Sequence, residues 1–278
     1  MTFLAQMDPH TGLMDKEADL ASGSALCEQY QSGKPFPHIV IDDFLPEPVA
    51  RRCLSEFDQL AGHADIASVS FDREQERAKR QYSPEVLNPP VRSLFYAFNS
   101  RPFIRVLESI CGINGLIPDP HFRGGGLHEI FNGGHLSVHA DFNHHKELNL
   151  ERRINLLIYL NDDWRDEYGG HLELWSDDML RCEHSVLPIF NRAVMFNTNS
   201  TSNHGNPKPV THPANVSRKS IALYYYTATW DSTKRAHTTQ FRARPGSSDT
   251  TDWSVKLREL AKDFLPPVVV RAISKAKK

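Results

Sequence analysis

The stretch Gly134-His-Leu-Ser-Val-His-Ala-Asp-Phe142 decides the fold, because polar and nonpolar residues alternate from His135 onward. A repeat of two residues is the pattern of a β-strand with one buried face. Side chains two residues apart on a strand point the same way. The stretch therefore predicts a strand that presents His139 and Asp141 on one face.

A third candidate ligand is His204, which lies 63 residues after Asp141. Two imidazoles and one carboxylate are the ligand set that holds non-haem iron(II) and leaves open coordination positions for chemistry. The simpler interpretation is that His139 and Asp141 form a structural hydrogen-bonded pair on a sheet. The sequence thus predicts a metal site at these three residues, with the structural pair as the alternative.

The same tripeptide occurs a second time, as His63-Ala64-Asp65. It follows a predicted helix (46–60) through Ala61-Gly62, and no alternating run leads into it. Such a setting is typical of a turn. We therefore assign this copy to a surface loop and leave it out of the metal site.

The composition is that of a globular protein with one large or two small domains. Of 278 residues, 40% are hydrophobic and 24% are charged, and the formal net charge is -2. We expect no nucleic-acid partner, no membrane span and no secretory leader, because the chain shows no basic surface signature and no long nonpolar run. The four cysteines form no CxxC pair, which favours reduced thiols in a cytoplasmic protein.

The predicted elements change from helices in the first part of the chain to strands in the middle. Prolines in first turns and nonpolar residues at three- and four-residue spacing predict helices, after an early strand (37–44). These helices span 46–57, 90–98 and 101–111, and a further one is predicted at 252–264, before a basic, solvated tail (271–278). Short strands are predicted at 126–131, 135–141, 153–160, 171–175, 185–189, 193–197 and 218–227. Strands at this spacing indicate a sandwich or barrel whose exposed edge or face the helices cover.

Two polar segments are interpreted as surface. The run 72–80 mixes charges of both signs, which is typical of a solvated loop or helix face. His144 and His145 lie in a polar loop just after the predicted metal strand. We expect this loop to face solvent rather than to form a second metal site.

Arg218-Lys219-Ser220 opens the last predicted strand, with Arg218 and Ser220 on the same face. A guanidinium offers a planar fork that matches a carboxylate, and a serine hydroxyl adds a donor beside it. The alternative is an ion pair that closes the strand end. Tyr159 lies in a run that is nonpolar on both faces, so its hydroxyl needs a buried partner, in the core or in a ligand.

The chain resembles the iron(II)/2-oxoglutarate-dependent dioxygenases, above all their prolyl 4-hydroxylase-like branch, over roughly residues 36–230. The resemblance rests on motifs that recur in the right order: His139, Asp141, Ile154-Asn-Leu-Leu-Ile-Tyr-Leu-Asn-Asp-Asp-Trp164, Gly169-Gly-His-Leu-Glu-Leu174, His204 and Arg218-Lys-Ser220. It implies a mainly β fold with flanking α-helices, in which N-terminal helices pack on a double-stranded β-helix (jelly-roll) core.

The domain boundaries follow from this resemblance. They are an N-terminal extension (1–35), a dioxygenase domain (36–230) and a C-terminal loop, helix and basic tail (231–278). Within the dioxygenase domain we expect helical support over 36–120 and the jelly-roll core over 121–230.

The resemblance also implies the roles of the candidate residues. His139, Asp141 and His204 would be the catalytic residues that ligate Fe(II), and Arg218 would bind the distal carboxylate of 2-oxoglutarate, assisted by Tyr159 and Ser220. The partners would be O2, the cosubstrate 2-oxoglutarate, ascorbate as an optional reductant, and a small-molecule or peptidyl substrate. The products from the cosubstrate would be succinate and CO2.

The implied reaction is hydroxylation of an unactivated C–H bond. Halogenases of this superfamily replace the acid of the metal motif with a small residue, so the presence of Asp141 favours hydroxylation. We expect a prolyl or other amino-acid side chain as substrate. The alternatives are a free amino acid, a sugar or a secondary metabolite, or a non-catalytic jelly roll that senses a metal or ligand. Many collagen-type prolyl hydroxylases carry lysine where this chain has Arg218. The resemblance also implies a lid over the site entrance, within residues 72–82. The oligomeric state stays open.

Overall fold

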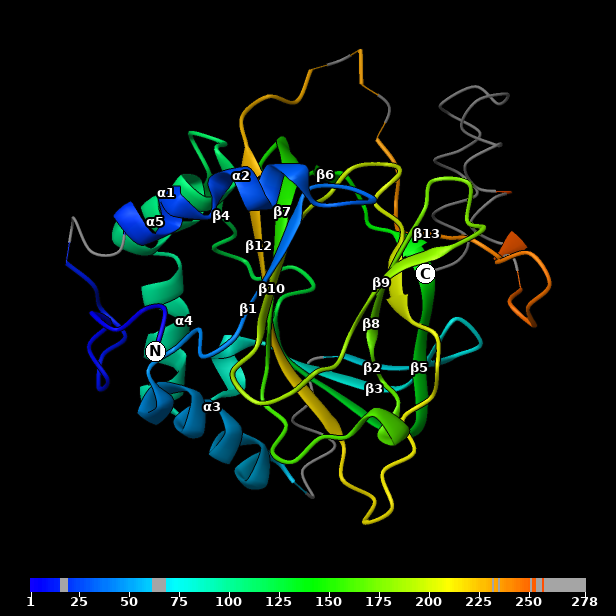
Figure 1. Ribbon diagram of the computed structural model, residues 1–278, viewed down its shortest axis with the longest axis horizontal. Coiled ribbons are helices and arrows are strands. Elements are labelled where there is room, and N and C mark those ends of the chain that lie inside the picture. Colours follow the sequence, from blue (N-terminus) through cyan, green and yellow to red (C-terminus); the bar gives the residue numbers. More distant parts are fainter. Residues whose placement is uncertain are drawn as a thin grey trace.

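The structure, a computed structural model, describes residues 1–15, 20–61, 69–231, 233–234, 236–250, 252, 253 and 257. A single curled antiparallel sheet dominates it, and helices cover one side of that sheet (Figure 1). The helices are α1 (Leu20–Ala25), α2 (Cys27–Ser32), α3 (Glu47–Leu60), α4 (Pro89–Phe98) and α5 (Arg101–Cys111), with 3-10 turns at Pro84–Val86 and Asp166–Tyr168. This arrangement confirms the predicted mainly β class with flanking helices.

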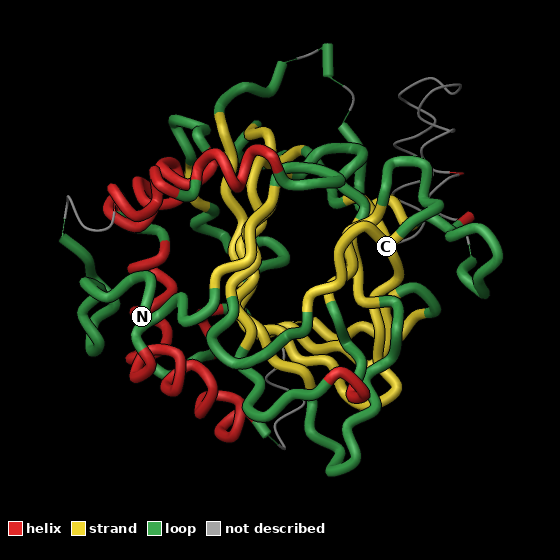
Figure 2. Tube along the Cα trace, in the orientation of Figure 1, coloured by secondary structure: helices red, strands yellow, loops and turns green. Residues whose placement is uncertain are grey.

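The strands follow one another in the order β1-β10-β7-β12-β5-β11-β8-β9 across the sheet, and β2, β3, β4, β6 and β13 join at its sides. Their bounds are β1 (His38–Ile41), β2 (Val69–Arg73), β3 (Glu76–Tyr82), β4 (Ile117–Pro118), β5 (Gly126–Ala140), β6 (His144–His145), β7 (Leu150–Tyr159), β8 (Leu172–Trp175), β9 (Cys182–Val186), β10 (Ala193–Asn197), β11 (His204–Asn206), β12 (Arg218–Thr227) and β13 (Gln240–Phe241). Figure 2 shows the strands curling around a common centre. The predicted jelly-roll core therefore corresponds to this curled sheet.

The helix predictions for 46–57, 90–98 and 101–111 are confirmed within three residues. Helix α5 starts after Ser100 with a proline in its first turn and ends at Gly112, whose φ of 72° is left-handed. Its buried residues recur at three- and four-residue spacing: Phe103, Val106, Leu107 and Ile110. Helix α3 runs to Leu60, the later of its two predicted ends, 57 and 60.

Both faces of strand β7 are buried, one against the helices and the other inside the curled sheet. Ile154, Leu156 and Ile158 pack into the core that the helices share, whereas Tyr159 belongs to a second cluster inside the curled sheet. Burial of one such aliphatic side chain stabilises the fold by roughly 1.5–3 kcal/mol. The run is nonpolar on both faces because both faces are covered.

Strand β5 is one strand, where the sequence predicted two. The pair Gly133-Gly134, which separates the two predicted strands, continues the strand with a bend, because Gly133 adopts a φ of 77° that other residues rarely reach. The first half of β5 pairs with β12, and the second half pairs with β11. This single strand thus carries His139, with Asp141 just beyond its end, between β12, which carries Arg218 and Ser220, and β11, which carries His204.

The charged run 72–80 forms a hairpin rather than the predicted solvated loop or helix face. It comprises the end of β2 and most of β3; the two strands pair with each other, and β3 also pairs with β5. Ala78 adopts a φ of 46°, and the register shifts between Arg77 and Lys79, so β3 carries a bulge. Because of this bulge, Glu76 and Lys79 both face the sheet interior, and Glu76 is only 5% exposed.

The N-terminal segment packs against the rest of the protein. Leu4 and Tyr30 are fully buried in the helix-side core, and the Tyr30 hydroxyl donates a hydrogen bond to Asn197 Oδ1 at 2.6 Å. The predicted C-terminal helix (252–264) lies almost entirely outside the described residues, and the basic tail lies wholly outside them.

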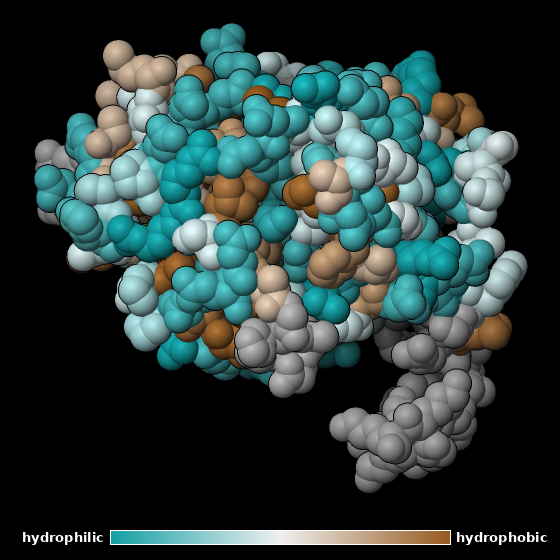
Figure 3. Space-filling view, turned by 90° about the horizontal axis from the view of Figure 1, so that it is seen from below, coloured by the Kyte–Doolittle hydropathy of each residue, from teal (hydrophilic) through white to brown (hydrophobic). Residues whose placement is uncertain are grey.

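The surface seen from below is mostly hydrophilic, with hydrophobic residues in small separate groups (Figure 3). This agrees with the collection of nonpolar side chains into the buried clusters. Among the described residues, no helix is both long enough and nonpolar enough to cross a membrane. All four cysteines are free thiols, as the scattered spacing predicts.

Candidate metal and cosubstrate site

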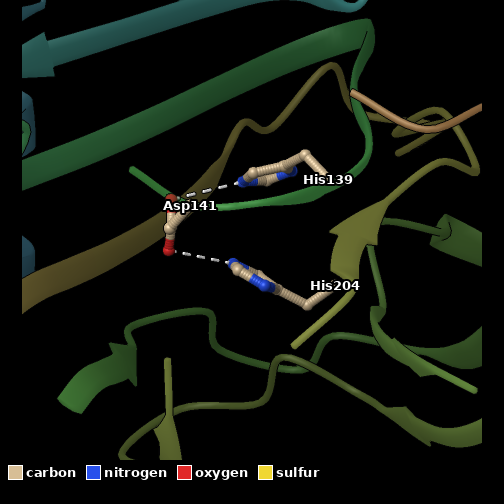
Figure 4. A group of neighbouring side chains, drawn as sticks. All are labelled: His139, Asp141 and His204. Atoms are coloured by element: carbon tan, nitrogen blue, oxygen red, sulfur yellow. Dashed lines mark ion pairs between the residues drawn. The ribbon is translucent and has the colours of Figure 1, made fainter. Parts of the chain in front are cut away.

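The predicted ligands His139, Asp141 and His204 come together inside the curled sheet. His139 lies on β5 directly opposite His204 on β11, and Asp141 follows the end of β5. Both imidazoles point at the carboxylate (Figure 4), with Nε2 of His139 3.5 Å from Oδ1 and Nε2 of His204 3.4 Å from Oδ2. Their ligand atoms lie within 4.8 Å of one another, so one ion could contact all three.

Backbone carbonyls fix the orientation of both imidazoles. Nδ1 of His139 lies 2.9 Å from the Ser137 carbonyl oxygen, and Nδ1 of His204 lies 2.9 Å from that of Ser202. A carbonyl only accepts, so each Nδ1 carries the proton and each Nε2 keeps its lone pair. That lone pair faces Asp141 and is free to bind a metal ion.

The charges around the carboxylate favour the ionised acid. Burial would raise the pKa of Asp141, but the neighbouring Arg152 and His204 outweigh it and hold the pKa well below its usual range. The pKa of His204 is lowered, mainly by burial and secondly by the neighbouring His139. An ionised carboxylate and a neutral imidazole are the protonation states that metal binding requires.

Two residues that the sequence reasoning missed hold Asp141 in place. Asn155 Nδ2 donates to Asp141 Oδ2 at 2.7 Å, and Arg152 Nη2 lies 3.0 Å from the same oxygen. Arg152 also donates to Asn155 Oδ1, through Nη2 at 2.7 Å and Nε at 3.0 Å. The guanidinium carbon lies 3.6 Å from the ring centroid of Tyr224, and Arg152 is only 2% exposed. The three polar groups thus form a closed, buried network.

Arg218 lies in the same cavity, at the start of β12, and is 5% exposed. Its Nε donates to the Gly170 carbonyl at 2.6 Å, and its guanidinium carbon lies 4.8 Å from the Tyr159 ring centroid. No acidic side chain within the described ranges forms an ion pair with it. The predicted alternative, an ion pair closing the strand end, is therefore not found there, and burial lowers the pKa of this guanidinium.

Tyr159 and Ser220 face the same region. They are directly opposite each other on β7 and β12, and both are buried, Tyr159 completely. The Tyr159 hydroxyl has no hydrogen-bond partner of acceptable geometry in the described part of the chain. A buried hydroxyl without a partner is costly, so this group has room for a ligand to accept its proton.

Gly170 packs directly against the Arg218 side chain. A Cβ atom at Gly170 would lie 2.8 Å from Arg218 Cδ, and the Gly170 φ is 69°. We expect Gly170→Ala to destabilise the fold by about 1–3 kcal/mol and to weaken 2-oxoglutarate binding. Gly133→Ala is the matched control, because Gly133 has a φ of 77° and nothing within 4 Å of its Cβ position. Equal cosubstrate affinity in the two variants, measured by calorimetry, would refute the link to Arg218.

The cavity that these residues line has a volume of about 200 Å³. Pockets for drug-sized ligands measure roughly 300–1,000 Å³. The space suits a small cosubstrate and one side-chain-sized group. His139, Asp141, His204, Arg218 and Ser220 all line it.

The other sequence candidates lie elsewhere. His63 and Asp65 lie outside the described residues. His145 is 1% exposed, so the prediction of a solvent-facing position is wrong for it; β6 pairs with β7 and turns this ring inward against Tyr226. Within the described ranges, the group His139, Asp141 and His204 alone meets the distance requirement for a shared metal ion.

Comparison with known proteins agrees with this geometry. Residues 125–226 match the sequence model of the family described as the 2OG-Fe(II) oxygenase superfamily. This part of the chain belongs to that superfamily. The protein is therefore an oxygenase that uses Fe(II) and 2-oxoglutarate, and the matched segment runs from the start of β5 almost to the end of β12.

Solved structures show how widely the fold of this oxygenase is shared. A prolyl hydroxylase from Trichoplax adhaerens, in complex with a hypoxia inducible factor peptide fragment, has a TM-score of 0.56 and 17% identity, covering 80% of this chain and 98% of its own. A prolyl-4-hydroxylase from Pseudomonas putida has a TM-score of 0.51 and 17% identity, covering 74% of this chain and 98% of its own. None of the curated proteins matches the sequence. The fold is thus prolyl 4-hydroxylase-like.

Proposed function

We propose that His139, Asp141 and His204 hold Fe(II), that Arg218 binds 2-oxoglutarate with Tyr159 and Ser220, and that the enzyme hydroxylates an unactivated C–H bond. One observation carries this proposal: the three candidate ligands share a single cavity with a buried guanidinium that pairs with no acid among the described residues. A buried charge requires compensation. A dicarboxylate that also binds the metal would supply it.

The residues present fit both groups. Two Nε2 lone pairs and one ionised carboxylate converge on one point, as iron(II) requires. Ligands about 2.0–2.2 Å from a metal stand about 3 Å apart, close to the separations found here. On the cosubstrate side, the Arg218 guanidinium and the Tyr159 hydroxyl are donors that match a carboxylate, and within the described ranges this hydroxyl has no hydrogen-bond partner.

Bound iron and 2-oxoglutarate supply the oxidising chemistry, in which O2 is consumed, 2-oxoglutarate yields succinate and CO2, and one oxygen atom enters the substrate. The chain itself orients and shields. Arg152 and Asn155 keep one oxygen of Asp141 engaged and thereby fix the direction of the carboxylate. The ring centroids of Phe241 and His139 are 5.4 Å apart, and those of Phe196 and His204 are 4.7 Å apart. Both imidazoles are therefore screened from water.

The small cavity supports a substrate that inserts one side chain or is itself small. We propose a prolyl or other amino-acid side chain, with a free amino acid, a sugar or a secondary metabolite as the alternative. Support for an amino-acid substrate comes from the 200 Å³ volume and from the fold shared with prolyl hydroxylases, one of which holds a peptide. Fold alone does not determine the substrate, because one architecture hosts many chemistries.

The reaction outcome is tested by product mass. With Fe(II), 2-oxoglutarate and a substrate library, we expect substrate-dependent succinate and a product that has gained one oxygen atom. No chlorinated product is expected at high chloride, because the Asp141 carboxylate occupies the coordination position that a halide would need. Mass spectrometry of both products, with a chelator-treated sample as the control, checks this prediction.

Two results would contradict the proposed function. A chlorinated product from the unaltered chain would overturn hydroxylation. Failure to bind 2-oxoglutarate in anaerobic calorimetry, with Fe(II) present, would overturn the assignment of the cosubstrate site.

A further inference from the structure

The cavity beside the candidate metal site carries more positive than negative charge. Four cationic and two acidic side chains line it: Arg73, Lys79, Arg152, Arg218, Glu76 and Asp141. Fe(II) and the doubly charged 2-oxoglutarate cancel each other in formal charge. With neutral histidines, the filled site therefore keeps a formal surplus of two positive charges.

One of these two surplus charges is located at the β2–β3 hairpin. Arg152 is paired with Asp141, and the proposed function assigns Arg218 to the cosubstrate. Lys79 and Arg73 remain, and they share one acid: Lys79 Nζ lies 2.9 Å from Glu76 Oε1, and Arg73 Nη2 lies 2.9 Å from Glu76 Oε2. One carboxylate between two cations leaves the hairpin positive.

The two hairpin cations differ in burial. The Lys79 side chain is 10% exposed and that of Glu76 is 7% exposed, so water compensates their charges only weakly, whereas the Arg73 side chain is 47% exposed and borders the solvent. Lysine has three N–H donors and arginine five. The hydrogen bonds to Glu76 use one donor of each residue. The geometry thus leaves donors of both cations available for a second anion.

The Phe241 ring lies between the hairpin cation Arg73 and the candidate ligand His139. The Arg73 guanidinium carbon is 5.1 Å from the Phe241 ring centroid, and that ring is 5.4 Å from the His139 imidazole. Arg73 also lines a second, outer cavity of about 660 Å³ between the hairpin and residues 244–250. Its side chain therefore borders both the inner cavity and a space large enough for more of a substrate.

We propose that the substrate presents a carboxylate to Lys79 and Arg73 while its reacting carbon lies beside His139, Asp141 and His204. This inference rests on the proposed function and narrows its substrate class to carboxylate-bearing molecules. The carboxylate has two sources, the main-chain acid of a free amino acid or an acidic side chain of a peptide. Sugars and neutral metabolites are disfavoured.

Matched acid and amide ligands test this directly. The protein with Fe(II) and 2-oxoglutarate is titrated without O2, so that binding is measured in the absence of turnover. The probes are free amino acids against their amides, and short peptides with aspartate or glutamate against the same peptides with asparagine or glutamine. We expect the acids to bind about ten- to hundredfold more tightly, the effect of a charge-assisted contact. The arm that responds identifies the source of the carboxylate.

Two variants of the hairpin should shift this preference in opposite directions. Lys79→Met removes a cation and should weaken binding of the acids about tenfold or more, with little effect on the amides. Glu76→Gln frees both cations and should tighten binding of the acids, by up to about tenfold. Misfolding would not produce opposite signs. Arg101→Gln, which removes an exposed cation outside the cavity, is the control for net charge.

Three outcomes would overturn the proposal while leaving the proposed function intact. The first is equal binding of acids and amides, or binding of no acid in the panel, by a protein that binds 2-oxoglutarate. The second is a loss of 2-oxoglutarate affinity in Lys79→Met without a change in acid preference, which would assign Lys79 to the cosubstrate. The third is a weaker rather than tighter binding of acids by Glu76→Gln. A failure to bind 2-oxoglutarate at all would instead contradict the proposed function.

Discussion

Asp141→Ala is expected to abolish iron binding and to destabilise the apoprotein at the same time. Loss of an outer partner of a metal ligand costs roughly 10–100-fold in affinity, so the loss of the only charged ligand should cost more than about 100-fold. The substitution also leaves the buried Arg152 guanidinium without its carboxylate partner. Breaking a buried ion pair from one side typically costs about 3–5 kcal/mol.

The two effects can be separated with a second substitution. Replacing Arg152 with Met in the Asp141→Ala background removes the uncompensated charge and should recover most of the lost stability, whereas iron binding stays lost. Metal content after anaerobic reconstitution and urea unfolding of the apoproteins are the two measurements. Undiminished iron in Asp141→Ala would disprove the ligand assignment. Unchanged stability would show that Asp141 does not compensate Arg152.

The candidate metal ligands were predictable because two of them lie two residues apart at the end of a regular strand. Alternation along residues 135–142 places His139 and Asp141 on one face, and the structure brings both beside His204. The pairing of His204 with His139 across β11 and β5 depends on contacts 65 residues apart in sequence. Strand β11 has only three residues and is too short to show a periodic pattern in the sequence.

The residues that the sequence did not reveal lie at irregularities of strands. Strict alternation would place Arg153 on the same face as Asn155, yet it is Arg152 that contacts Asn155. The register between β7 and β12 shifts at Tyr225 and Tyr226, which are paired with Ile154 and Arg152. A bulge reverses the inward and outward faces beyond it. Alternation along β7 therefore did not identify Arg152 and Asn155 as partners of Asp141.

The β2–β3 hairpin was not predicted from the sequence, again because a bulge interrupts the alternation of faces. In β3, the shift between Arg77 and Lys79 turns Glu76 and Lys79 to one side although they are three residues apart. A run of alternating charges has the composition of a solvated face, and nothing in composition indicates that two of its members pair with each other inside a sheet. Bulges are frequent next to active sites, so charged runs before a predicted barrel merit examination as strands.

Arg218 carries the second large prediction, in which stability and binding change in opposite directions. Its guanidinium is buried, and no described carboxylate pairs with it. Burial of a charge without a partner destabilises a fold. We therefore expect Arg218→Met to make the apoprotein more stable, by about 1–2 kcal/mol, even though the hydrogen bond to the Gly170 carbonyl is lost.

The same change should remove the cosubstrate anchor. Loss of a charge-assisted bidentate contact is worth on the order of 1.5–3 kcal/mol, so Arg218→Ala and Arg218→Met should bind 2-oxoglutarate roughly ten- to hundredfold more weakly. Arg218→Lys should rescue this only in part, because an ammonium is a point charge where the site holds a planar fork. Calorimetric titration of the iron-bound proteins measures each affinity.

Ligand-dependent stability joins the two effects in one experiment. At a 2-oxoglutarate concentration of 100 times Kd, binding should stabilise the unaltered protein by about 2.7 kcal/mol. Arg218→Met should gain almost nothing from the same concentration. Without cosubstrate, this variant should therefore be more stable than the unaltered protein. With cosubstrate added, the difference should disappear. An unchanged 2-oxoglutarate affinity would assign the anchor to another residue. A less stable apoprotein would show that the guanidinium is compensated by the fold itself, and the buried charge would then no longer be evidence for an anionic ligand.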